Sequence, residues 1–83
     1  MRTFLSRSLP TTIDELEAEI RQIDEWRLLC TNLIKECMAK EDVMKKIFYA
    51  AEIHELIQER SMLETHREFR RVRIARLKYE EQG

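Results

Sequence analysis

The absence of glycine and proline between Thr11 and Gln82 is the feature that most limits how this chain can fold. The one Pro is residue 10 and the one Gly is residue 83, so the interior lacks the residues that tight turns between strands require. With 43% hydrophobic and 37% charged side chains, the 83-residue chain is also not disordered by composition. We therefore predict an all-α fold in a single small helical domain.

The first helix is predicted to begin at Thr12 and to end near Ala39. Thr12, with Glu15 three residues later, has the spacing of a capping box, and acids in the first turn suit the helix dipole. Apolar residues then follow at alternating spacings of three and four, as on a face that packs against one neighbour: Ile13, Leu16, Ile20, Ile23, Cys30, Ile34 and Cys37. Leu28 and Leu29 lie off this stripe and indicate a second contact.

The second helix is predicted to cover residues 42–82, with Asp42 as its N-cap. Ser61 and Glu64 repeat the capping-box spacing, so a break near residues 60–61, which would give three helices, is the alternative. Apolar residues fall on two opposite sides of this helix. One side carries Val43, Ile47, Ala50, Ala51, His54, Ile57, Phe69, Val72, Ala75 and Tyr79, and the other carries Ile53, Leu56, Leu63, Ile74 and Leu77.

The two helices should pack as an antiparallel hairpin, in which residues equally distant from position 41 face each other. This register places Asp24 near Gln58 and lets the long second helix overshoot the first by about a dozen residues, roughly 18 Å. A chain this short makes a thin core alone, and two apolar sides require two neighbours. We therefore expect the fold to be completed by dimerisation or by packing on another protein.

The N-terminal segment, residues 1–11, contains arginine and serine but no acid. We predict a flexible arm. One alternative is a segment that docks Phe4, Leu5 and Leu9 onto a helix. The other is a mitochondrial targeting segment, because the composition resembles the start of a presequence.

Both cysteines, Cys30 and Cys37, are placed in the first helix. A separation of seven residues puts their Cα atoms about 10 Å apart, which is too far for a disulfide. Reduced thiols favour a reducing compartment such as the cytoplasm. No apolar run is long enough to span a membrane.

The chain offers no constellation for catalysis, a metal or a cofactor. The stretch from His54 to Gln58 comes one residue short of the zinc protease motif, which needs a histidine where Gln58 stands. The segment Leu16–Leu33 superficially resembles the opening helix of the all-helical chorismate mutases, but the two substrate-binding arginines of that family fall on Glu17 and Ile34. We expect a protein that is not an enzyme and holds no cofactor.

Our first hypothesis is a non-enzymatic interaction protein, of the adaptor, small chaperone or inhibitor type, that offers an apolar helix face with a basic rim to another protein or to itself as a homo-oligomer. The predicted anchors are Leu56, Leu63, Ile74 and Leu77, with Arg70 and Arg73 as the rim. On this hypothesis, Asp at positions 63 and 74 should abolish association and preserve helicity.

The second hypothesis is a nucleic-acid-binding helical dimer that uses the basic end of the second helix. The net charge is only -1, but the cations cluster there as Arg67, Arg70, Arg71, Arg73, Arg76 and Lys78. A simpler role for these side chains is pairing with the acids at the start of the first helix.

Overall fold

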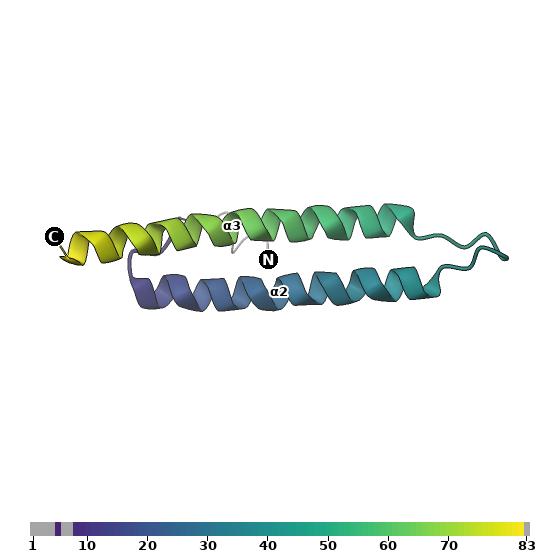
Figure 1. Ribbon diagram of the computed structural model, residues 1–83, viewed down its shortest axis with the longest axis horizontal. Helices are drawn as coiled ribbons and strands as arrows, with labels where there is room; N and C mark the ends of the chain where they lie inside the picture. The colour runs from purple at the N-terminus through teal and green to yellow at the C-terminus, as the bar shows by residue number, and fades with distance from the viewer. Residues whose placement is uncertain (1–4, 6–7, 83) are drawn as a thin grey trace.

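The computed structural model describes Leu5 and residues 8–82. In this part of the chain two long helices, α2 (Ile13–Lys40) and α3 (Ala50–Gln82), lie side by side and antiparallel, so the predicted all-α helical hairpin is confirmed (Figure 1). The molecule is a rod with extents of 63 × 20 × 14 Å. The connection between the helices forms one tip of the rod, and the end of α3 forms the other.

The predicted N-cap of α2 at Thr12 is confirmed. Thr12 has an extended backbone, and its hydroxyl accepts a hydrogen bond from the Glu15 N–H at 3.3 Å. The helix ends one residue beyond the predicted position, at Lys40, where the Glu41 N–H donates to the Met38 carbonyl at 3.3 Å. These bonds satisfy backbone groups that a helix terminus leaves open.

The start of α3 differs from the prediction, because the helix begins at Ala50 and not at residue 42. Asp42 does not cap a helix. Its carboxylate instead accepts hydrogen bonds from the N–H groups of Met44 at 3.0 Å and Lys45 at 3.2 Å. Its backbone exchanges two hydrogen bonds, both 2.9 Å, with Ile47. An Asp side chain that accepts hydrogen bonds from the backbone N–H groups two and three residues later favours a turn. The β-branched and aromatic residues that follow favour an extended chain.

The break considered near residues 60–61 is absent, since α3 is continuous from Ala50 to Gln82. Ser61 does not serve as an N-cap. Its carbonyl accepts a hydrogen bond at 3.2 Å from the Thr65 hydroxyl one turn later, a bond that helix interiors accommodate. Two helices, not three, therefore make up the described hairpin.

The longer connection also changes the register that the sequence predicted. Asp24 lies opposite Arg67 and not Gln58, and Thr31 lies opposite Arg60. Residues that face each other across the hairpin are equally distant from about position 45, and not from position 41, because residues 41–49 form the connection. The projection of α3 beyond the start of α2 is shorter than predicted as a result (Figure 1).

The core is a single seam between the helices, with one contribution from the N-terminal segment. Leu5 is buried and packs with Ile23, Cys30 and Leu63, flanked by Trp26 and Met62. Leu5 is thus docked on the helix pair, whereas Phe4, from the same alternative, lies outside the described residues. The remaining buried apolar side chains of the seam are Leu16, Ile34 and Ile74.

Among the described residues, Lys46 is the non-glycine residue whose backbone has a positive φ, at 56°. A side chain in this left-handed region costs about 1 kcal/mol, which glycine avoids. Lys46→Gly should therefore raise the free energy of unfolding by a few tenths to about 1 kcal/mol, measured by urea denaturation followed by circular dichroism. Lys45→Gly is the matched control, and a larger stabilisation at position 45 than at 46 would contradict this account.

Candidate interaction surface

The side of α3 that faces α2 contains the residues predicted as partner anchors. Leu63 has no exposed surface and Ile74 is 9% exposed, while Leu56 and Leu77 are half-buried. These side chains form the seam of the hairpin itself. In this fold Leu63 and Ile74 are covered by the chain, so the accessible apolar surface of α3 has to lie elsewhere.

Arg70, predicted as part of a basic rim, is instead the largest fully buried side chain among the described residues. Its Nε donates to the Glu19 carboxylate at 3.0 Å, and its Nη1 donates to the His66 carbonyl at 2.9 Å. The Glu19 side chain is 8% exposed. This ion pair joins the helices inside the seam, where pairing is what makes a buried charge tolerable.

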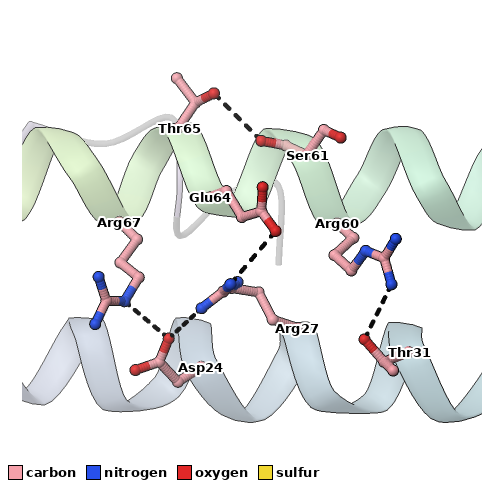
Figure 2. A network of polar contacts seen from close by, with 8 residues as sticks. All are labelled: Asp24, Arg27, Thr31, Arg60, Ser61, Glu64, Thr65 and Arg67. Atoms are coloured by element: carbon pink, nitrogen blue, oxygen red, sulfur yellow. Dashed lines mark hydrogen bonds and ion pairs between the residues drawn. The ribbon is translucent and has the colours of Figure 1, made fainter.

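A polar network lies along one edge of the helix pair (Figure 2), and we call it the polar seam: Asp24, Arg27, Thr31, Arg60, Glu64 and Arg67. One oxygen of Asp24 accepts from Arg27 and from Arg67, both at 2.9 Å. Arg27 reaches across to Glu64 at 3.3 Å, and these carboxylates, Asp24 first, raise the pKa of its guanidinium. Partly exposed pairs contribute little stability each, so their main effect is to fix the register.

The simpler role considered for the arginines therefore holds for two of them, since Arg67 and Arg70 pair with acids of α2. Arg71 pairs within α3 with Glu68, and this bond lowers the pKa of the Glu68 carboxyl. The other residues of the predicted nucleic-acid surface, Arg73, Arg76 and Lys78, are exposed. Half of the predicted cationic surface is thus already engaged within the chain.

The opposite side of α3 is exposed and carries apolar side chains, and we call it the outer face: Ile57, Phe69, Val72, Ala75 and Tyr79. Phe69 is 52% exposed and Tyr79 is 78% exposed. The sequence identified this stripe but did not show that the other stripe would be covered by α2. Arg67 and Arg70 lie on the inner stripe opposite acids of α2, but this match becomes visible only once the register of the two helices is known.

Two hollows of opposite charge lie along α3. The acidic groove is lined by Glu52, Glu55, Leu56, Gln58, Glu59 and Met62. The basic groove is lined by Leu9, Phe69, Val72, Arg73, Arg76, Leu77 and Glu80. Neither was predicted from the sequence, because each combines residues whose exposure depends on how α2 and the N-terminal segment pack.

Apolar side chains are also exposed away from α3. The tip of the rod presents Val43 and Met44, which are 77% and 93% exposed, together with Phe48. On α2, Leu28 and Leu29, for which the sequence indicated a second contact, are exposed. The sequence missed the tip because it placed Val43 and Ile47 within a helix.

Burial shifts the pKa of two titratable groups beside the seam, Cys30 and His66. Burial raises the pKa of the Cys30 thiol, so this cysteine serves as an apolar core residue. Burial and the charge of Arg70 lower the pKa of His66, whose ring packs edge-on against Phe69 with centroids 5.7 Å apart. No group of three or more His, Cys, Asp or Glu among the described residues is placed to hold a metal ion.

No protein family matches this chain, and no curated protein or solved structure is significantly similar to it. Within the described residues, neither helix combines the length and apolarity needed to cross a membrane. Function therefore has to be inferred from the hairpin itself, and its most distinctive surface is the outer face of α3 with the two grooves beside it.

Proposed function

We propose that this chain is a non-enzymatic helical interaction protein, of the adaptor, small chaperone or inhibitor type, that binds a helix of a partner on the outer face of α3. The observation that carries the proposal is the exposure of Phe69, Val72 and Tyr79 on a helix whose other side is already packed. An amphipathic partner helix laid along such a row is a common recognition mode. The compartment would be a reducing one, such as the cytoplasm, where Cys30 and Cys37 stay free.

The composition of the outer face suits a protein interface. Aromatic side chains and arginine are the residue types that most often contribute large binding free energies. Phe69 and Tyr79 supply the aromatic anchors, and Arg71 and Arg76 line a hollow together with Tyr79, Val72 and Ala75. Burying one large apolar side chain of this kind contributes about 1.5 to 3 kcal/mol, so a few anchors make a useful interface.

Nucleic-acid binding is the less favoured alternative, because of the six cations proposed for it Arg70 is buried, and Arg67 and Arg71 already pair with carboxylates. The remaining cations, Arg73, Arg76 and Lys78, give three per chain, so a dimer would reach only the lower end of about six to ten phosphate contacts, and Arg73 and Arg76 lie beside the acid Glu80. A steep fall of affinity with salt would favour nucleic acid, whereas binding through apolar anchors should depend on salt weakly.

The proposal is tested with a photocrosslinking amino acid introduced in the full chain in its own cells. At position 72 it should give an adduct of defined mass, which Phe69→Asp in the same chain should remove. The same amino acid at position 21, where exposed Arg21 lies on α2, is the matched control and should give none. No adduct at position 72, or equal adducts at both positions, would contradict the proposal.

A further inference from the structure

We propose that the helix received by α3 is α3 of a second copy of this chain, packed antiparallel, so that the acidic groove of each copy meets the basic groove of the other. This inference rests on the proposed function and names the partner. It uses the edge of the outer face that carries Phe69 and Val72, which also line the basic groove, whereas Ile57, Ala75 and Tyr79 lie on the other edge. It is carried by the positions of the two grooves along α3.

The two grooves are related by a two-fold axis through a point between Thr65 and His66. Residues at equal distance from that point are Glu55 and Arg76, Gln58 and Arg73, Glu59 and Val72, and Met62 and Phe69; each pair has one member in the acidic groove and one in the basic groove. An isologous dimer needs this relation, because every contact occurs twice with the roles exchanged.

Six of the eight residues in these pairs share one side of the helix, and Glu59 and Val72 lie just beyond its two borders. At 100° per residue, Glu55, Met62, Phe69, Arg73 and Arg76 fall within about 60° of each other on the circumference of α3. Leu63 and Arg70, which face α2, lie outside this sector, as does the polar seam. A second α3 can therefore lie along the sector without displacing either contact with α2.

The charges select the antiparallel arrangement. The described lining of the acidic groove has three carboxylates, Glu52, Glu55 and Glu59, and no cation. The basic groove has Arg73 and Arg76 beside the single acid Glu80. A parallel arrangement would place like charges together, whereas the antiparallel one places arginines against carboxylates at both ends and leaves Met62 and Phe69 at the centre.

The thin core of the hairpin is consistent with this partner. The buried apolar side chains of the described chain form one seam between two helices. Two hairpins joined through α3 would make a four-helix arrangement, in which that helix packs on two sides. The contact from Glu55 to Arg76 would be about 30 Å long at 1.5 Å per residue.

The test is the solution mass of the full chain, by sedimentation equilibrium across a concentration series, with circular dichroism to confirm folding. The wild type should be a dimer. Arg73→Glu with Arg76→Glu should raise its dissociation constant at least about tenfold, and so should Glu55→Lys with Glu59→Lys. Mixed in equal amounts, the two variants should form a heterodimer, since opposite charges then meet again at both ends.

The matched control reverses two exposed charges on α2, Arg21→Glu with Lys35→Glu, and should leave the mass unchanged. A monomeric wild type would overturn the inference, and so would a dimer that survives both reversals. The proposed function fails separately: a monomer that still forms the position-72 adduct with a different protein retains an interaction role, whereas a chain without any adduct does not.

Discussion

Leu63→Asp together with Ile74→Asp should unfold the hairpin. Both side chains are buried in the seam between α2 and α3, with Leu63 at 0% and Ile74 at 9% exposure. Placing an unpaired carboxylate at such a site costs more than about 4 kcal/mol. Two such substitutions together cost more than the free energy of unfolding of a marginally stable small domain, which lies at the low end of about 5 to 15 kcal/mol. The helical circular dichroism signal should therefore be lost. This outcome is the opposite of the retained helicity expected from the sequence.

Ile57→Asp together with Val72→Asp is the matched control, because it introduces the same two carboxylates on the same helix. Both positions belong to the outer face, at 38% and 40% exposure. Helicity should survive, with a loss of about 1 kcal/mol per position from the part of each apolar side chain that Asp no longer buries. Equal loss of helicity in both double variants would mean that α3 does not present the inner stripe to α2.

The second large effect is expected at Arg70. Arg70→Ala should lower the free energy of unfolding by about 3 to 5 kcal/mol, because it removes the guanidinium that holds the buried Glu19 carboxylate. Arg71→Ala is the neighbouring control. The Arg71 side chain is 59% exposed and pairs with Glu68 of the same helix, so its loss should destabilise the hairpin far less than the loss of Arg70. Urea denaturation of both variants measures the difference.

A double variant separates the ion pair from the rest of the Arg70 site. Glu19→Leu with Arg70→Met replaces both charges by apolar side chains, and it should recover most of the stability that Arg70→Ala loses. If Arg70→Ala and Arg71→Ala had equal effects, Arg70 would not be buried against α2 in solution. If the double variant were as unstable as Arg70→Ala, packing of the arginine would matter more than the pairing of the charges.

Several features of the hairpin were predictable because they depend on residues close together in the sequence. The Thr12 cap involves a bond to Glu15, three residues away, and it lies where the sequence placed it. The helical nature of the chain follows from spacings of three and four residues and from the missing Gly and Pro. The existence of two apolar stripes on the second helix follows from the same periodicity.

The sequence could not determine where α3 begins. At Asp42 a capping bond and a turn bond compete, and both use the same carboxylate oxygens. The turn forms because Met44 and Lys45 present their N–H groups to Asp42 and the backbone of Ile47 pairs with it. Because this turn forms, α3 begins at Ala50, the tip of the rod is exposed, and the register between the two helices differs from the predicted one.

The tertiary structure alone decided which stripe of α3 lies inside and therefore which surface is available to a partner. The hydrophobic periodicity does not distinguish the two stripes, because it gives only the direction of each side chain around the helix and not which neighbour that side packs against. The decision depends on contacts between distant residues, such as Arg70 with Glu19, separated by 51 positions in the chain. The sequence by itself thus determined two helices with two apolar stripes, and only long-range packing covered Leu63 and left Phe69 exposed, since burial is a property of the assembled pair.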